Sequence, residues 1–263
     1  MLRAYRNWRR KRILKRAAPP DAAWWATLAH LPFMAGLSKQ ELERLRALCV
    51  LFLHEKHIEG AAGVQVTEPM RLTIAVQACL PILNLGLDYY RGWSSIIVYP
   101  GQFVPGHEEI DEVGVVSIDD AALSGESWID GPLILSWDDA RRSGAGDGVN
   151  VVIHEFAHKL DMLNGDANGY PPLHPDMDRE AWSATFSTAY AEFCRSVENG
   201  DETALDPYAA HDPGEFFAVL SEAFFEVPGL VLQRYPEVYR QLCTFYRQHP
   251  AQRVARALRG PSW

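Results

Sequence analysis

Two histidines and a glutamate near the middle of the chain have the types and spacing of a metal site. His154, Glu155 and His158 stand in the order H-E-x-x-H inside an apolar run, residues 149–163. On an α-helix, residues four positions apart lie one turn apart and about 40° apart around the axis, so both imidazoles can hold one metal ion. Glu155 is then placed to act on a water molecule at that ion. The pattern is typical of a zinc-dependent hydrolase.

The residues around this motif predict a helix that is largely buried. Val151, Val152 and Ile153 come directly before it, and Leu160 follows it. Unpaired polar groups in a protein interior cost several kcal/mol, so two histidines and a glutamate on a buried helix need a partner. A metal ion is one such partner. The alternative is a core helix whose histidines are satisfied by neighbouring side chains.

A third protein ligand must come from elsewhere, because a catalytic zinc ion takes three and keeps one position open. The class with the pattern H-E-x-x-H-x-x-G-x-x-H is excluded, since Asp161 and Asn164 stand where it needs glycine and histidine. An apolar helix is predicted over residues 213–226, with Asp212 as its N-cap and Pro213 as its first residue. Its carboxylates are the candidates for the third ligand.

The spacing of residues in this second helix leaves two alternatives for the third ligand. Glu215 stands in the first turn, and Glu222, seven residues on, returns to nearly the same face. Glu215 can instead complete the cap formed by Asp212. Glu222 can instead orient a ligating histidine from behind. Glu226, near the end of the helix, is expected to be exposed.

Two further residues are candidates for supporting roles. Asp161 lies one turn after His158 and is expected to fix a histidine tautomer or to bind a basic neighbour, Arg142 or Lys159. His211 stands just before the second helix and is a candidate for substrate binding. A capping or surface role for His211 is the alternative.

The composition is that of a globular protein with a large core. Of its 263 residues, 48% are hydrophobic and 22% are charged, which is compatible with one or two domains. No stretch of 18 or more uncharged apolar residues is present to span a bilayer. The four cysteines stand far apart in apolar stretches without a C-x-x-C pair, which predicts reduced thiols and favours a cytoplasmic location: Cys49, Cys79, Cys194 and Cys243.

Basic charge is concentrated at the start of the chain. Residues 1–16 hold eight arginines and lysines and no acidic residue, although the whole chain has a net charge of −9. The remainder is therefore strongly acidic, which argues against direct nucleic-acid binding. We expect residues 1–20 to form a basic arm that is solvated and partly disordered. Contact with a membrane surface, an acidic partner or the acidic body of the protein is the alternative.

The order of predicted elements indicates an α+β protein. Helices are expected first, strands in the middle and helices last: helices at 21–31, 38–52 and 71–83, strands at 95–99, 113–118 and 132–137, and helices at 178–199, 213–226 and 235–248. We expect a small mixed sheet with helices, and the H-E-x-x-H motif on a buried helix. Residues 21–250 are expected to form a single domain with a helical N-terminal part, followed by a tail over 251–263.

The last predicted strand is also a candidate for substrate binding. If residues 133–137 lie at a sheet edge, an extended peptide can pair with them by β-addition. Leu133 and Leu135 would then contact the substrate. An internal position in the sheet is the alternative.

Several segments beyond the motif also match a known family. They lie at residues 80–87, 99–100, 125–128, 131–132, 154–161, 164–166 and 208–222. With these segments the chain resembles the Mlc titration factor A family of bacterial zinc metallopeptidases, over most of residues 24–253. That family in turn resembles the catalytic domain of anthrax lethal factor, whose motif also has a tyrosine seven residues before the glutamate ligand. The corresponding pair in this chain is Tyr208 and Glu215.

The resemblance implies a zincin-like metallopeptidase fold that holds one zinc ion per chain. His154, His158 and Glu215 would be the ligands, so the resemblance favours Glu215 over Glu222. Glu155 would be the general base, and Tyr208 would stabilise the transition state. The resemblance also implies hydrolysis of a peptide or protein substrate, with aminopeptidase activity.

A regulatory partner is implied as well, because the best-known member of the family sequesters a transcriptional repressor of sugar uptake. The main alternative to a peptidase is therefore a non-catalytic regulator that binds such a repressor. A membrane-associated protein that uses its basic arm is a third alternative.

Overall fold

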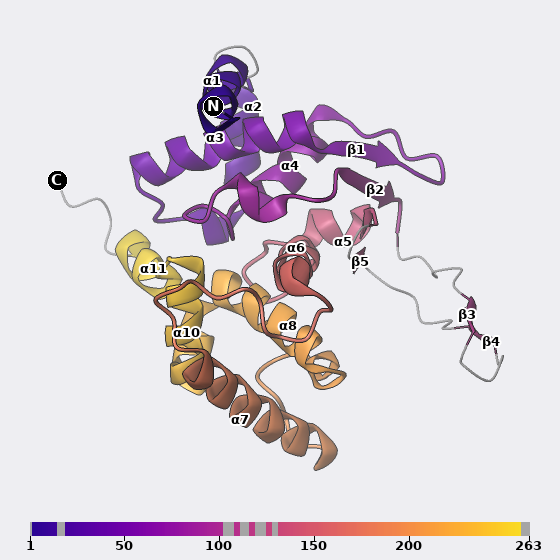
Figure 1. The fold of residues 1–263 in the computed structure, drawn as a ribbon, viewed down its shortest axis with the longest axis vertical. Helices are drawn as coiled ribbons and strands as arrows, with labels where there is room; N and C mark the ends of the chain where they lie inside the picture. Colours follow the sequence, from indigo (N-terminus) through magenta and orange to yellow (C-terminus); the bar gives the residue numbers. More distant parts are fainter. Residues whose placement is uncertain are drawn as a thin grey trace.

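The computed structural model of the chain describes residues 2–14, 19–101, 108–110, 116–118, 125–127 and 131–258. Helices dominate these residues, and the main sheet is small and lies to one side of them (Figure 1). The helices of the first half are α1 (Leu2–Leu14), α2 (Asp21–Ala29), α3 (Lys39–Glu55), α4 (Glu68–Cys79) and α5 (Trp137–Arg142). The helices of the second half are α6 (Val151–Asp161), α7 (Arg179–Glu198), α8 (Pro213–Glu226), α9 (Pro228–Arg234), α10 (Pro236–Tyr246) and α11 (Pro250–Leu258).

The main sheet has four strands in the order β1-β2-β6-β5. Its strands are β1 (His57–Gly60), β2 (Ser95–Tyr99), β6 (Leu133–Ser136) and β5 (Gly125–Ser127). The first three run parallel, and β5 runs antiparallel to β6. Two further strands, β3 (Glu108–Ile110) and β4 (Val116–Ile118), form a separate antiparallel pair. A mixed, helix-dominated architecture with a small sheet is therefore present, as the sequence predicts.

The prediction that β6 forms an edge of the sheet was wrong. β6 lies between β2 and β5, and both of its sides carry strand pairing. Leu133 and Leu135 are fully buried and therefore do not contact a substrate through their side chains. Leu133 and Leu135 are two residues apart on an internal strand and both face the interior, which explains why the sequence of this segment is apolar. The edge of the described sheet on this side belongs to β5.

Some elements differ from the sequence-based expectation. The expected strand 113–118 is described only as β4, which pairs with β3 and not with the main sheet; residues 113–115 lie outside the described part of the chain. β1 was not predicted, because only Ile58 of its four residues is buried. Residues 250–258, expected mostly as a tail, form α11, and its Arg253 is buried.

The expected basic arm also contains regular structure. Residues 2–14 form α1, and Arg10 makes an ion pair with Asp88 at 2.7 Å. Ile13 and Leu14 pack against the core. These contacts give the end of α1 a docking site on the body of the protein. Within the described parts of the chain, every helix is too short or too polar to cross a lipid bilayer.

Helix α6 lies in the middle of the molecule, between the sheet with its helices and the C-terminal helices (Figure 1). It packs most extensively against α8, and α4 contacts it from the other side. Four phenylalanines of α8 are almost fully buried, and each contributes roughly 1.5–3 kcal/mol of hydrophobic stabilisation. They are Phe216, Phe217, Phe224 and Phe225. Their rings pack against aromatic side chains of α7 and α10, which fixes α8 to these C-terminal helices.

A buried lysine joins the start of the sheet to α6. Lys56, between α3 and β1, donates hydrogen bonds to the backbone carbonyls of Tyr90 and Trp93. Its ammonium lies 3.6 Å from the centre of the Trp93 ring, and Lys159 of α6 lies over the same ring at 5.2 Å. The pKa of Lys56 is lowered to about 8, because burial disfavours the charged amine; Glu55 opposes this effect and Lys159 reinforces it.

The lowered pKa makes stability depend on pH through Lys56. Between about pH 8 and the ordinary lysine pKa of 10.5, the unfolded chain binds more protons at this residue than the folded chain. The free energy of unfolding therefore rises with pH over this window. We predict that Lys56→Met removes this rise, so that wild type gains stability relative to the variant from pH 8 to pH 10.5. Urea unfolding, monitored by tryptophan fluorescence, measures the free energy of unfolding at each pH. The control is Lys39→Met, a change at an exposed lysine, which should show no such difference.

Candidate metal centre

Two helix N-caps set the positions of the site residues. Asn150 caps α6, and its side-chain oxygen accepts a hydrogen bond from the Ile153 amide at 2.9 Å. Asp212 caps α8 and accepts from the amides of Gly214 and Glu215 at 2.7 and 2.9 Å, as the sequence predicts. Such caps fix the first turn of each helix. Glu215 is therefore held in a defined turn opposite α6.

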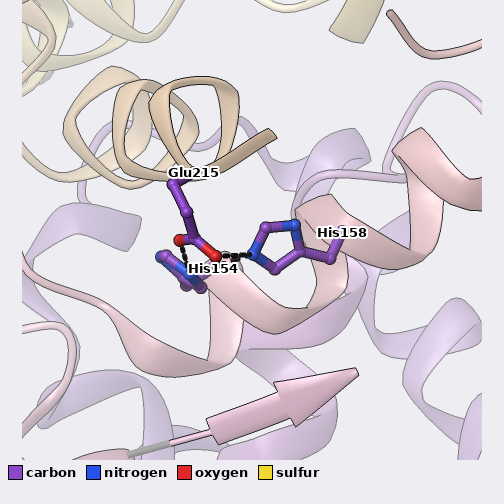
Figure 2. A group of neighbouring side chains, drawn as sticks. All are labelled: His154, His158 and Glu215. Atoms are coloured by element: carbon purple, nitrogen blue, oxygen red, sulfur yellow. Dashed lines mark hydrogen bonds and ion pairs between the residues drawn. The ribbon is translucent and has the colours of Figure 1, made fainter. Parts of the chain in front are cut away.

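The structure brings His154, His158 and Glu215 together between α6 and α8 (Figure 2). The Nε2 atoms of the two histidines are 3.1 Å apart. The Glu215 carboxylate lies 3.0 Å from the His154 ring and 3.3 Å from the His158 ring through its two oxygens. Figure 2 shows all three side chains pointing at one another across the helix–helix contact.

This arrangement fits a metal ion. Metal–ligand distances of ~2.0–2.1 Å in a tetrahedron place neighbouring ligand atoms ~3.3–3.4 Å apart, close to the observed separations. Two imidazole nitrogens and a carboxylate oxygen are also a common ligand set for a divalent transition metal. Among the described residues, this is the only group of three or more histidine, cysteine or acidic side chains that could hold such an ion.

The charges of the site favour a positive centre. Burial disfavours the charged form of His154, but Glu222, Glu215 and Glu155 outweigh it and raise the pKa of His154 well above its ordinary value. Burial also opposes ionisation of Glu215, yet the two histidines hold the pKa of Glu215 well below its usual range. The surrounding carboxylates therefore stabilise a cation between these groups, whether a proton or a metal ion.

Glu155 is buried next to the three candidate ligands. Its Oε2 has no hydrogen-bond partner within the described structure. The pKa of Glu155 is raised to about 7, because burial disfavours the carboxylate; the two histidines oppose this effect, and Glu215 and Glu222 add to it. A carboxyl group with a pKa near 7 can both accept and release a proton at neutral pH.

Glu222 lies behind His154. Its Oε1 is 2.7 Å from the Nδ1 of His154, and its other oxygen accepts a hydrogen bond from the Asn150 amide. His154 thus directs Nε2 toward Glu215 and Nδ1 toward Glu222. This is the geometry of a carboxylate that orients a ligating imidazole. Glu222 occupies the supporting role rather than the place of the third ligand in the cluster.

Asp161 supports the site in a way the sequence does not predict. Its Oδ2 accepts a hydrogen bond from the Gly169 amide at 2.6 Å, and no hydrogen bond joins it to His158 in the described structure. Gly169 has φ +74°, and a Cβ there would lie 2.5 Å from the Pro213 carbonyl. Asp161 therefore holds the loop after α6 against the start of α8. The expectation that Asp161 fixes a histidine tautomer is not supported by a hydrogen bond to His158 among the described residues, and Arg142 pairs with Asp139 at 2.6 Å instead; a contact of Asp161 with Lys159 stays a prediction.

Tyr208 and His211 lie beside the site on the approach to α8. The Tyr208 ring centre is 6.4 Å from that of His154, and the side chain is about half exposed. Burial of the hydroxyl and the nearby carboxylates of Glu215 and Glu155 raise the pKa of Tyr208, so its phenol stays protonated. His211 stacks on Tyr208 and pairs with Asp212 at 3.1 Å, largely in solvent. Its role in substrate binding stays a prediction.

A cavity of about 830 Å³ surrounds the cluster. Since Glu215 faces His158 and Glu222 faces Asn150, α8 runs antiparallel to α6 and the cavity extends along both helices from the cluster. Toward the start of α6 its walls combine apolar residues with polar ones: Val149, Val151, Val219, Ala223, Val227 and Leu230, and Asp139, Arg142, Ser143 and Asp147. In the other direction the lining residues include Met162, Ala167, Leu205, Asp206 and Tyr208.

Comparison with known proteins places these residues in a family. The family model described as glucose-regulated metallo-peptidase M90 matches residues 5–247. A relative named Mlc titration factor A from Salmonella arizonae is 39% identical over 249 residues, which cover 94% of this chain and 98% of the relative. The protein of the same name from Escherichia coli is 37% identical over 246 residues, covering 93% of each chain. The resemblance inferred from the sequence is confirmed.

The different roles of the two glutamates of α8 predict different losses of metal. Glu215→Ala removes a ligand atom and should abolish stoichiometric metal binding. Glu222→Ala keeps all three metal ligands but removes the carboxylate that orients the His154 ring. It should therefore weaken metal affinity roughly 10–100-fold. Metal content by atomic absorption and competition with a chelator measure both effects. Exposed Glu198→Ala is the control, and metal loss in the Glu222 variant alone would reverse the assignment.

Proposed function

We propose that this chain, which belongs to the glucose-regulated metallo-peptidase M90 family, is a zinc-dependent peptidase with a zincin-like fold. The observation that carries the proposal is the buried Glu155 carboxyl beside the cluster of His154, His158 and Glu215. A general base next to three metal-ligating groups, inside a cavity, is the arrangement of metal-assisted peptide hydrolysis. We further propose one domain over residues 21–250.

Zinc is the metal that this ligand set favours. Two imidazoles and one carboxylate are the ligands of many catalytic zinc sites, which keep one position open for water. When bound, zinc supplies Lewis acidity that makes water a nucleophile at neutral pH. One zinc ion per chain is proposed, because the described residues provide one cluster of this kind.

The protein's own groups then move the protons of hydrolysis. Glu155 accepts the proton of the attacking water and delivers it to the leaving amine, which its pKa near 7 allows. A nearby cation would lower the pKa of Glu155 and favour its basic form at the start of the reaction. Tyr208 keeps its phenolic proton and can donate it as a hydrogen bond to the oxyanion. Losing one such donor typically costs about 3–4 kcal/mol.

The cavity supports a peptide as substrate. The apolar wall toward α9 suits an apolar side chain next to the scissile bond. Asp147 and Asp206 line the cavity and are exposed, so a free amino group can find a carboxylate there; this supports aminopeptidase activity. An extended substrate would pair with β5, which lies at the sheet edge and contacts α6.

We predict that Glu155→Gln keeps zinc but hydrolyses peptides at least ~100-fold more slowly, because the amide cannot accept the proton. Zinc content is measured by atomic absorption, and hydrolysis with peptide and amino-acid anilide substrates. Glu198→Gln, an exposed change of the same type on α7, is the control. Full activity in the Glu155 variant would exclude it as the general base.

A second candidate function is regulation by binding a repressor. The relatives carry the name Mlc titration factor A, and the family description refers to glucose regulation. We propose that this chain binds a transcriptional repressor of sugar uptake in the cytoplasm. The cysteines support this location, since all four are free thiols.

Binding and catalysis can be separated with the same variant. If the chain acts as a regulator, Glu155→Gln should bind the repressor as tightly as wild type, because the substitution changes one buried carboxyl group. Isothermal titration calorimetry with purified repressor measures the affinity. Absence of binding by both proteins would exclude the regulatory role and leave the peptidase proposal untouched.

A further inference from the structure

A buried polar network lies behind His154 and is not explained by catalysis. It contains Gln77, Gly146, Asn150, Glu222 and Glu226, and only Glu222 of these lines the cavity. We propose that Asn150 and Glu226 are positioning residues that fix the cavity-lining loop 143–149 and, through Glu222, the ring of His154. The proposal rests on the metal site proposed above.

Asn150 is the centre of this network. It is fully buried, and its side chain accepts from the Ile153 amide and donates to Gln77 at 2.8 Å and to Glu226 at 2.7 Å. Its backbone amide donates to Glu222, which holds the Nδ1 side of His154. One residue therefore combines the helix cap, the contact with Glu226 and the contact with the carboxylate that orients a metal ligand. A helix cap alone requires only the first of these.

Glu226 receives two hydrogen bonds, one on each carboxylate oxygen. Asn150 donates to Oε1, and the backbone amide of Gly146 donates to Oε2 at 2.9 Å. The side chain is buried, contrary to the sequence-based expectation, because the chain turns at Val227 and α9 follows directly at Pro228. Two N–H donors, one at each oxygen, need a group that accepts at both positions, which an amide does not offer.

The hydrogen bond to Gly146 connects this network to the cavity. Gly146 belongs to a loop in which Gly144, Gly146 and Gly148 all have φ between +82° and +98°, a conformation that favours glycine. The next residues of the loop, 147–149, line the cavity. A continuous series of hydrogen bonds thus runs from Gly146 through Glu226, Asn150 and Glu222 to His154.

Two isosteric substitutions test the network. Glu226→Gln turns one acceptor into a donor that faces an N–H group, either that of Asn150 or that of Gly146. Asn150→Asp removes the donor facing Glu226 and places two carboxylates together. We expect each variant to lower zinc affinity about tenfold, in the range for groups that support a ligand.

The double variant restores the pairing of positions 150 and 226 in reverse, while Gln77, whose Oε1 accepts from Asn150 in the wild type, must turn its amide to donate to the new carboxylate. When both substitutions are combined, the new amide at position 226 can donate to the new carboxylate at position 150 and accept from the Gly146 amide. Zinc affinity should therefore exceed that of either single variant without reaching the wild-type value, because the hydrogen bond between positions 150 and 226 is regained but Gln77 loses its own hydrogen bond to the Ala140 carbonyl.

A matched control separates positioning from loss of stability. Ser221, also on α8, is buried and accepts a hydrogen bond from Tyr246 at 2.8 Å, away from the cluster. Ser221→Ala should destabilise the protein without changing zinc affinity. Zinc affinity is measured by competition with a chelator, the environment of the site by the visible absorption of the cobalt-loaded protein, and stability by thermal unfolding of the metal-free protein.

The outcomes decide between the proposals. Weaker zinc binding and an altered cobalt spectrum in both single variants, with partial recovery in the double variant, support the inference. The inference is overturned if the single variants bind zinc as tightly as wild type, or if their loss of zinc affinity is no larger than that of Ser221→Ala. If a single variant does not fold, the double variant decides alone: it must fold and bind zinc. Failure of wild type itself to bind zinc would instead refute the proposed function.

Discussion

The antiparallel contact between α6 and α8 is the constraint on which the site depends. It brings the cluster together with Glu155, Glu222 and Glu226, in an interior that also buries Gln77, Asn150 and Asp161 among aliphatic and aromatic side chains. Burying so many ionisable groups is unfavourable unless each has a partner of suitable charge. His154 lies between two carboxylates, with Glu215 in front of it and Glu222 behind it, whereas His158 faces Glu215 alone and its Nδ1 has no hydrogen-bond partner among the described residues. The phenylalanines of α8 anchor that helix to α7 and α10, on the far side from these groups.

The two candidate functions place different demands on this contact. Hydrolysis needs the buried carboxyl of Glu155, whose Oε2 has no hydrogen-bond partner within the described structure. Binding a repressor needs an accessible surface and does not require that carboxyl. A protein that served only as a binding partner would gain stability from replacing the buried charges by apolar groups of similar volume. Their presence is therefore the physical argument for chemistry at this site.

Local patterns predict the parts of the site that lie within one helix turn or one cap. The spacing of His154 and His158 predicts their shared face, and Asp212 and Pro213 predict where α8 begins. The choice of Glu215 over Glu222 depends on how α8 lies against α6, which no local pattern contains, and the family resemblance was needed to favour it. Glu226 was expected to be exposed, because a sequence does not show that α9 folds back at the end of α8. The sequence leaves open whether β6 lies at an edge or inside the sheet for a similar reason, since its internal position depends on pairing with β5, a strand of three residues.

The candidate ligands come from segments about 60 residues apart, so the cluster exists only where both helices are docked. The unfolded chain would not bind an ion in this way, so an ion bound at the site would stabilise the native state alone. That stabilisation grows with the logarithm of the ratio of ion concentration to dissociation constant. Occupancy of the site would therefore set how often the helix pair opens. In a cell short of metal, copies without an ion would open more often and be degraded sooner, which links the abundance of the protein to metal supply.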